Sequence, residues 1–416
     1  METTTSWWRE PTRGQWATFG AAWFGWVLDA FDFSIFVLVI EEMQKEFGVT
    51  NTAAGWTITL TLVLRLVGAY FVGSLADRWG RKIPLMMSIV WFALCDGAIA
   101  FAPSFTWILV LRTLFGLGMG AEWAVGATLA MENWPERSRG IASGLLQAGW
   151  PVGYLLASQV TRFVVPELGW RPLFLLAALP ALLVLPIRAW VPESSEWRRA
   201  KGSVKKESLH AQLRPLAWGV GVMALAFSAY YALYAPYPKL LRAEVGMSLG
   251  SMTNHIALFN IGMLVGAIGC GAIAARKGPL WAIVPPALLT LPILPLYVAS
   301  SGALTPWLPV GAFLGGLIGA GYSGVAPLLL TRLFPAAVRA RCVGFVYNAG
   351  AFPAAFVPTA IFALGDHASI PLGRSVAFVA GGCQLALAAL LLWRPPPQIV
   401  EPDPVPVLAE ARHGAS

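Results

Sequence analysis

Apolar runs of roughly 20 residues recur along the whole chain. Each run is long enough to cross the hydrocarbon core of a bilayer, about 30 Å thick, as one helix. With 57% apolar and only 12% charged residues, the composition is not that of a soluble enzyme. The sequence therefore predicts an all-α integral membrane protein with twelve transmembrane helices, at residues 17–40, 54–75, 83–101, 105–131, 139–161, 170–190, 216–239, 254–275, 281–300, 306–331, 340–363 and 373–393.

A decapeptide occurs twice, once in each half of the chain. Residues 73–82 read Gly-Ser-Leu-Ala-Asp-Arg-Trp-Gly-Arg-Lys, and residues 271–280 read Gly-Ala-Ile-Ala-Ala-Arg-Lys-Gly-Pro-Leu. Each copy follows an apolar helix and lies between two expected spans. A glycine-rich stretch after Arg112 also has a counterpart in the second half, at Gly315, Gly316, Gly319 and Gly321. A chain that repeats itself in this way consists of two copies of one unit, so we expect two pseudo-symmetric six-helix halves.

The longest polar stretch between spans separates the two halves, and the end of the chain is rich in proline. We therefore expect an N-terminal six-helix bundle at residues 1–190 and a cytoplasmic central loop at 191–214. A C-terminal six-helix bundle follows at 215–394, and then a disordered cytoplasmic tail at 395–416.

The net charge of +8 is informative through its distribution. With both termini in the cytoplasm, most Lys and Arg residues fall in the inner loops, and the outer loops hold only Lys45, Arg162, Arg171, Lys239, Arg242 and Arg374. This bias is the positive-inside rule. It predicts a multi-pass protein of the cell inner (plasma) membrane and makes a nucleic-acid partner unnecessary to explain the basic pI.

The sequence indicates no metal site and no disulfide framework, because its four cysteines are scattered within the expected spans. It also lacks a nucleotide-binding glycine–lysine loop, so ATP-driven transport is unsupported. We expect no enzyme activity and no cofactor, with a proton gradient as the energy source. The expected partners are a small organic anion, protons and membrane lipid, and we expect a monomer.

The first decapeptide is similar to the signature Gly-x-Leu-x-Asp-Arg-x-Gly-Arg-Lys, which the major facilitator superfamily carries between its second and third helices. The resemblance extends from Trp16 to Trp393 and implies twelve helices in two halves around a central cavity. Three shorter features resemble the sialate/lactate-type proton symporters: Asp29-Ala-Phe-Asp32-Phe, Gly-Met-Gly-Ala-Glu122-Trp123 and Val-Pro-Glu193-Ser-Ser-Glu196-Trp197. Related aromatic-acid symporters also carry an Asp-x-x-Asp pair in the first helix.

Ionisable groups inside a membrane are costly, and each needs a partner, a cavity or a function. Asp29 and Asp32 are three residues apart, so their carboxylates project from nearly the same helical face. We interpret them as proton-coupling groups; the alternative is that one of them pairs with Arg65 or Arg112 to hold helices together. Glu122 is a further candidate proton carrier or substrate ligand. Asp96 is either a pairing partner or a solvated residue.

Arg65 lies midway along its expected span, and a guanidinium that stays charged suits a carboxylate substrate. The resemblance implies a role for Arg112 in proton transfer. Structural ion pairs with nearby aspartates are the alternative for both arginines. The other candidate substrate-binding residues are polar groups in later helices: Gln147, Tyr230, Tyr234, Tyr322 and Asn348. Packing and interfacial roles are the alternative for each of these.

The decapeptide is the candidate gating motif. Asp77 ends a helix and is expected to cap the start of a helix from the other half, where backbone amides favour an anion. The superfamily resemblance implies that Glu132 pairs with Arg78 or Arg81. Together these groups would hold the cytoplasmic face closed. The expected gating residues are Gly73, Asp77, Arg78, Gly80, Arg81, Lys82 and Glu132.

The sequence thus favours a secondary active transporter that carries a small organic acid anion with protons by alternating access. A lactate- or pyruvate-like monocarboxylate is the favoured substrate, and sialate is a further one. The alternatives are a symporter for aromatic acids or other metabolites, a proton-coupled drug exporter, and a non-transporting receptor of the same fold.

Overall fold

A computed structural model describes residues 7–49, 51–183, 185, 189–190, 192–194, 197–198, 212–299, 302–358, 360–361, 364 and 370–394. Most of the expected central loop, including 199–211, and the whole expected tail at 395–416 lie outside the described residues. Within the described ranges all regular secondary structure is helical and no strand occurs.

The helices of the first half occupy residues up to 183. They are α1 (Arg13–Leu38), α2 (Ile40–Phe47), α3 (Asn51–Trp79), α4 (Lys82–Ile99), α5 (Phe105–Asn133), η1 (Glu136–Ser138), α6 (Arg139–Gln147), α7 (Gly149–Leu168), α8 (Arg171–Ala177) and η2 (Leu179–Leu183).

The helices of the second half begin at residue 213. They are α11 (Leu213–Tyr234), α12 (Tyr237–Lys239), η4 (Leu240–Glu244), α13 (Leu249–Lys277), α14 (Pro279–Tyr297), η5 (Thr305–Trp307), α15 (Leu308–Leu314), η6 (Gly315–Ala320), η7 (Gly321–Val325), α16 (Ala326–Arg332), α17 (Arg339–Ala354) and α19 (Leu372–Trp393).

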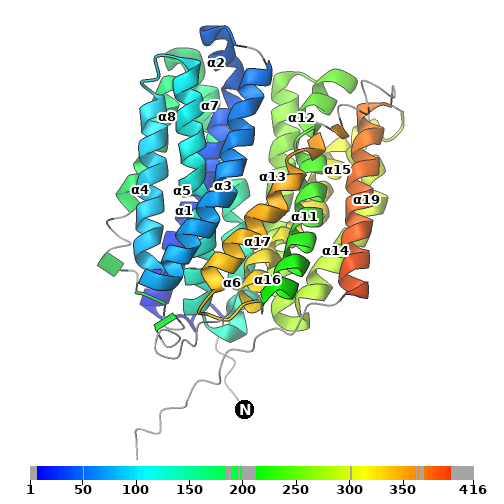
Figure 1. The fold of residues 1–416 in the computed structure, drawn as a ribbon. Helices are drawn as coiled ribbons and strands as arrows, with labels where there is room; N and C mark the ends of the chain where they lie inside the picture. Colours follow the sequence, from blue (N-terminus) through cyan, green and yellow to red (C-terminus); the bar gives the residue numbers. More distant parts are fainter. Residues whose placement is uncertain are drawn as a thin grey trace, which may run out of the picture.

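The two sets of helices stand side by side as two bundles, blue to teal for the first and green to red for the second (Figure 1). Seven helical segments of the described residues are long and apolar enough to cross a membrane by length and composition. The expected all-α membrane fold is therefore confirmed.

One expected span, 306–331, is not a single regular helix. It runs through α15, a wider π-helical stretch in η6, a tighter 3₁₀ stretch in η7 and then α16. Glycine is a poor helix former, and Gly315, Gly316 and Gly319 are concentrated where the winding changes. Such irregular turns re-aim the side chains that follow them, and here they precede Tyr322 and Ser323.

The bundles approach each other closely at the end that carries the 73–82 motif, which we call the motif end. There α3 packs against α17, and α6 packs against α13. A Cβ atom added to Gly73 would lie 2.8 Å from the Cα of Arg341, and one added to Gly271 would lie 2.5 Å from the carbonyl oxygen of Gly140. The glycine that opens each decapeptide copy therefore has the same task, because only glycine lets the facing backbones come this close.

At the opposite end, each bundle is tied internally by a glutamate. Glu46, in α2, accepts hydrogen bonds from the indole of Trp170 at 2.7 Å and from Arg171 at 2.6 Å, at the start of α8. Glu244, at the end of η4, accepts hydrogen bonds from the amides of Leu372 and Gly373 at the start of α19. Each glutamate thus ties the segment that follows the first long helix of its bundle to the start of a late helix, α8 in the first half and α19 in the second.

Candidate functional site

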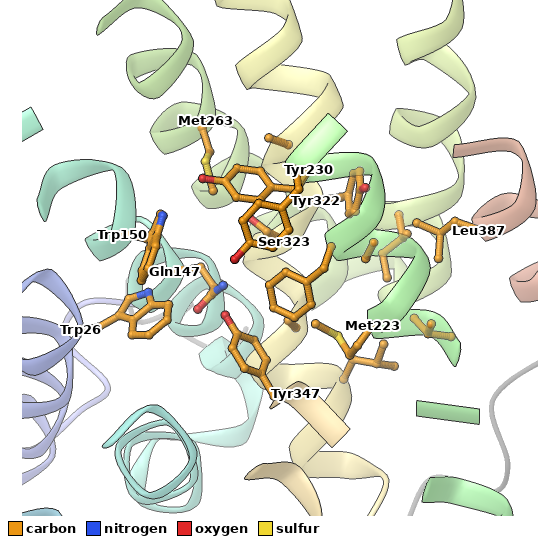
Figure 2. Close-up of a pocket in the computed structure, with 18 of the residues that line it drawn as sticks. Trp26, Gln147, Trp150, Met223, Tyr230, Met263, Tyr322, Ser323, Tyr347 and Leu387 are labelled. Carbon is orange, nitrogen blue, oxygen red and sulfur yellow. The ribbon is translucent and has the colours of Figure 1, made fainter. Parts of the chain in front are cut away.

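A cavity lies between the two bundles. The first half contributes Trp26 from α1, Arg65 from α3, Gln147 from α6 and Trp150 from α7. The second half contributes the rest of the lining, including Met223, Phe227, Tyr230, Tyr231, Met263, Tyr322, Ser323, Tyr347 and Leu387. Figure 2 shows Trp26, Gln147 and Trp150 on one side and the tyrosines and Met223 facing them.

Tyr347 of α17 organises the motif-end side of the cavity. Its ring stacks on Trp123 with centroids 3.5 Å apart and meets the ring of Phe227 edge-on at 4.8 Å. Its hydroxyl is directed toward Gln147 (Figure 2), and Gln147 in turn accepts a hydrogen bond of 3.0 Å from the indole of Trp123. The contacts of Tyr347 with Trp123 and Gln147 cross from one bundle to the other, and the rings together form an aromatic floor.

Arg65 supplies a cation to this largely aromatic cavity. Its side chain is buried, and its guanidinium carbon lies 5.9 Å from the centroid of Tyr347. Within the described residues, Nε and Nη2 have no hydrogen-bond partner. A buried cation with unused donors is expensive in a low-dielectric site, so the cavity is suited to an anion that supplies the missing acceptors.

The other candidate substrate-binding residues divide into two groups. Gln147, Tyr230 and Tyr322 line the cavity, as expected. Tyr234 and Asn348 are not among the residues that line it. Tyr234 stacks on Tyr230 one helical turn away, at 5.1 Å, and Asn348 turns its amide to the carbonyl oxygen of Gly344 at 2.9 Å.

Several lining residues were not identified from the sequence: Trp26, Trp150, Phe227 and Ser323. The chain has 19 tryptophans and 22 phenylalanines, and an aromatic residue in a membrane helix is ordinarily a packing or interfacial residue. The only available signal was position. Trp150 lies three residues after the predicted site residue Gln147, just past the boundary between α6 and α7.

Three carboxylates of the first half, Asp29, Asp32 and Glu122, are buried but are not among the residues that line the cavity. Within the described residues, neither carboxylate oxygen of Asp29 or Asp32 has a hydrogen-bond partner, and Oε2 of Glu122 has none. Glu122 is in electrostatic range of Asp29 and Arg65. The carboxylates are therefore linked by charge to the arginine that lines the cavity.

Arg112 pairs with Asp96, one of the nearby aspartates that the sequence offered as its alternative partners. Its Nη1 lies 3.2 Å from Oδ1 of Asp96 in α4, and both side chains are buried. The guanidinium is held between the rings of Phe36 and Phe115, at 4.5 and 4.1 Å from their centroids. Of the two interpretations open for Asp96, the structure shows the paired one.

Asp77 joins the bundles at the motif end. Its carboxylate accepts hydrogen bonds from the amides of Ala340 at 3.3 Å and Arg341 at 3.2 Å, in the first turn of α17. Arg81 also donates to it, at 2.7 Å. The free amides at a helix N-terminus favour an anion, so Asp77 caps α17 across the boundary between the halves, in the geometry expected from the sequence.

Glu132 forms a second tie beside the first. Its Oε1 lies 3.4 Å from Nη2 of Arg81 and accepts a hydrogen bond of 2.9 Å from Nη1 of Arg339 in the other half. Ser194 donates to its other oxygen. Of the two arginines expected to pair with Glu132, the structure selects Arg81, whereas Arg78 is exposed. We call Asp77, Arg81, Glu132 and Arg339 the motif-end network.

The turn between α3 and α4 completes this region. Gly80 has a φ of +103°, a backbone conformation that side chains other than glycine rarely adopt. The amides of Arg81 and Lys82, which follow it, donate to the carboxylate of Glu193 at 2.8 and 3.3 Å. The expected gating residue Lys82 thus takes part through its backbone at the start of α4.

The sequence pattern of the family described as Major Facilitator Superfamily matches residues 22–303 of this chain. The chain belongs to the major facilitator superfamily. This confirms the resemblance drawn from the first decapeptide, and it identifies the protein as a multi-pass membrane transporter and not an enzyme.

Curated relatives within the superfamily are similar over most of their length. The probable 4-methylmuconolactone transporter of Cupriavidus pinatubonensis (strain JMP 134 / LMG 1197) is 33% identical over 83% of this chain and 82% of its own. The sialic acid transporter NanX of Escherichia coli (strain K12) is 29% identical, with 83% and 86% covered. The cis,cis-muconate transport protein of Acinetobacter baylyi (strain ATCC 33305 / BD413 / ADP1) is also 29% identical, with 83% and 87% covered.

A solved superfamily structure has the same fold. The proton:xylose symporter XylE bound to 6-bromo-6-deoxy-D-glucose superposes with a TM-score of 0.79, covering 92% of this chain and 96% of its own. Its sequence identity is 18%, so the likeness concerns the fold alone. The expected architecture of twelve membrane helices in two six-helix halves agrees with this match.

Proposed function

We propose that this transporter moves a small organic acid anion together with protons, and that the anion has a flat, unsaturated or aromatic body. The single observation that carries the proposal is the cavity, in which the buried guanidinium of Arg65 has unused donors and faces aromatic walls. A carboxylate would satisfy those donors through charge-assisted hydrogen bonds. A planar body would stack against Trp26, Trp150 and the tyrosines.

An aromatic acid is one of the alternatives that the sequence left open, and the cavity suits it better than the favoured lactate- or pyruvate-like monocarboxylate. A lactate- or pyruvate-like monocarboxylate satisfies Arg65 but leaves the aromatic walls largely uncovered, whereas an aromatic acid uses both. The printed names of the relatives, among them the muconate and 4-methylmuconolactone transporters, support an unsaturated acid. A lipophilic cation is disfavoured because Arg65 would repel it.

Proton coupling is assigned to Asp29, Asp32 and Glu122 with Arg112. The support is that these carboxyl groups are buried and that the described residues offer no hydrogen-bond partner to either oxygen of Asp29 or Asp32. Intramembrane carboxyl groups of this kind are typical of proton pathways. We further place the motif end in the cytoplasm of a monomer in the inner membrane, because the Lys and Arg residues concentrate at that end.

Uptake into proteoliposomes tests the proposal. Labelled benzoate, muconate and lactate are supplied with and without an inward proton gradient. We expect gradient-dependent accumulation, with benzoate or muconate preferred to lactate. Asp29→Asn or Asp32→Asn should abolish accumulation while counterflow exchange persists. No gradient-dependent uptake of any organic acid would refute the proposal.

Two variants test the substrate site. Arg65→Gln should weaken binding of every acid by tenfold or more, because it removes a charge-assisted pair of hydrogen bonds. The exposed Arg162→Gln is the matched control and should change nothing. Trp150→Leu should weaken binding of benzoate by about fivefold and binding of lactate far less, since only the benzoate ring loses a stacking partner. Equal losses for both acids would rule out the aromatic part of the proposal.

A further inference from the structure

Arg112 stands against the helix face that carries the two proposed proton carriers, but it does not bond to them. Asp29, Asp32 and Phe36 fall at spacings of three and four residues, so they share one face of α1. The guanidinium of Arg112 lies 4.5 Å from the centroid of Phe36 on that face. Its hydrogen bond nevertheless goes to Asp96 on α4.

The pairing of Arg112 with Asp96 leaves hydrogen-bonding atoms without partners on the arginine and on the three aspartates around it. Oδ2 of Asp96 and Nε of Arg112 have no hydrogen-bond partner within the described residues, and neither do the four carboxylate oxygens of Asp29 and Asp32. The Arg112 backbone is fixed, because its carbonyl oxygen accepts a hydrogen bond of 2.8 Å from Thr61. Only its side chain needs to move for Arg112 to change partner.

The charges around Asp96 come from three helices. Asp29 and Asp32 are on α1, Cys95 adjoins Asp96 on α4, and Arg112 is on α5. Asp96 interacts electrostatically with each of these groups. Arg65, which lines the cavity, and Glu122 also interact electrostatically with Asp29. A single guanidinium cannot neutralise every one of these carboxylates, so the negative charges compete for it.

We infer that Asp96 is a positioning residue that holds Arg112 while the α1 carboxyl groups carry a proton, and gives Arg112 up to them when the proton leaves. An unpartnered carboxyl group is accommodated in a low-dielectric interior as the neutral acid, which matches the arrangement observed here. On deprotonation, the new carboxylate at Asp29 or Asp32 competes for Arg112. The proton passes to water.

Because Arg112 changes partner in this way, the carboxylate that remains on α1 after proton release gains a positive charge beside it. Without Asp96, Arg112 would be free to pair with α1 permanently, and the repulsion from the Asp96 carboxylate would also be gone. Both changes favour the deprotonated form of the α1 carboxyl groups, Asp29 and Asp32. The inference rests on the proposed proton coupling and adds to it a residue that touches neither the cavity nor the substrate.

The test measures protonation directly on the purified full-length protein. Infrared difference spectroscopy follows the protonated-carboxyl band from pH 9 to pH 4 in wild type, Asp96→Asn and Asp96→Glu. We expect the midpoint to fall by about one pH unit in Asp96→Asn, a tenfold change in proton affinity, and to stay near wild type in Asp96→Glu. Asp32→Asn identifies the part of the band that comes from α1.

Transport separates the inference from the proposed function. The pH midpoint of gradient-driven benzoate uptake should fall together with the infrared midpoint in Asp96→Asn, while benzoate exchange without a gradient continues. An unchanged midpoint with a lower rate in both assays would show a merely structural role and overturn the inference. Wild type that shows the infrared titration but no gradient-driven uptake would instead refute the proposed function. Asp96→Ser serves the same measurements if Asp96→Asn does not fold.

Discussion

Arg339 in the second bundle donates a hydrogen bond of 2.9 Å to Glu132 in the first, and both side chains are buried. Glu132 also lies 3.4 Å from Arg81, which itself donates to the carbonyl oxygen of Ala336 across the same boundary at 2.7 Å. The halves are therefore joined at the motif end by charge as well as by close backbone packing. Under the alternating access that we expect for this transporter, these bonds would open and re-form in every cycle.

Replacing Glu132 by Gln should weaken the closed motif end. The neutral amide leaves Arg81 and Arg339 without their shared counter-charge, and breaking a buried pair in this way costs about 3–5 kcal/mol. We expect a single cysteine placed at Ala340 to react several times faster with a water-soluble thiol reagent in the Glu132→Gln background. The labelling rate is measured in a protein whose four native cysteines have been replaced, so that only the introduced cysteine reacts.

Arg78→Gln provides the matched control, because Arg78 belongs to the same decapeptide but is exposed. It should leave the labelling rate unchanged. A labelling rate in Glu132→Gln equal to that of the control would show that the motif-end network does not hold this end closed.

Gly271→Ala should destabilise the contact between α13 and α6. The added methyl group would meet the backbone of Gly140 at 2.5 Å, and the helices must separate to accept it. Overpacking of this kind costs about 1–3 kcal/mol. We expect a lower midpoint of thermal unfolding in detergent and slower uptake.

Gly269→Ala, two residues earlier on the same helix, is the control for intrinsic helix propensity. Nothing lies within 4 Å of a Cβ atom at that position, so the substitution should be neutral or slightly stabilising. Equal effects of the two substitutions would contradict the close-packing role of Gly271.

The tie between α2 and α8 should persist in mild acid. Burial opposes ionisation of Glu46, but hydrogen bonds from Arg171 and Trp170 outweigh it and lower the pKa of Glu46 below its ordinary value. A lowered pKa in the folded state means that the tie stabilises the protein above the unfolded-state pKa and is lost as the pH falls through the folded-state pKa. The difference in unfolding temperature between wild type and Glu46→Gln should therefore be constant from pH 7 to pH 5 and shrink below about pH 4.

The direction in which this difference in unfolding temperature changes with pH decides the test. A difference that grew on acidification would mean that protonated Glu46 makes the better contact, and it would contradict the assignment. Arg162→Gln, an exposed change in the same bundle, should track wild type at every pH.

The sequence by itself determined the architecture. Hydrocarbon satisfies no backbone hydrogen bond, so runs of apolar residues in this chain must form membrane helices, and the repeated decapeptide fixes their grouping into two halves. The sequence also pointed to the buried charges, because Asp29, Asp32, Arg65, Arg112 and Glu122 are conspicuous in apolar surroundings.

Only the tertiary structure decided how these groups are paired and which side chains face the cavity. The partner of Arg112 proved to be Asp96, sixteen residues away on another helix, and Arg339 joined Glu132 from the opposite bundle. Tyr347 lines the cavity whereas its neighbour Asn348 does not, because adjacent residues of a helix point about 100° apart. Composition cannot reveal such choices, since they depend on the rotation of each helix against its neighbours.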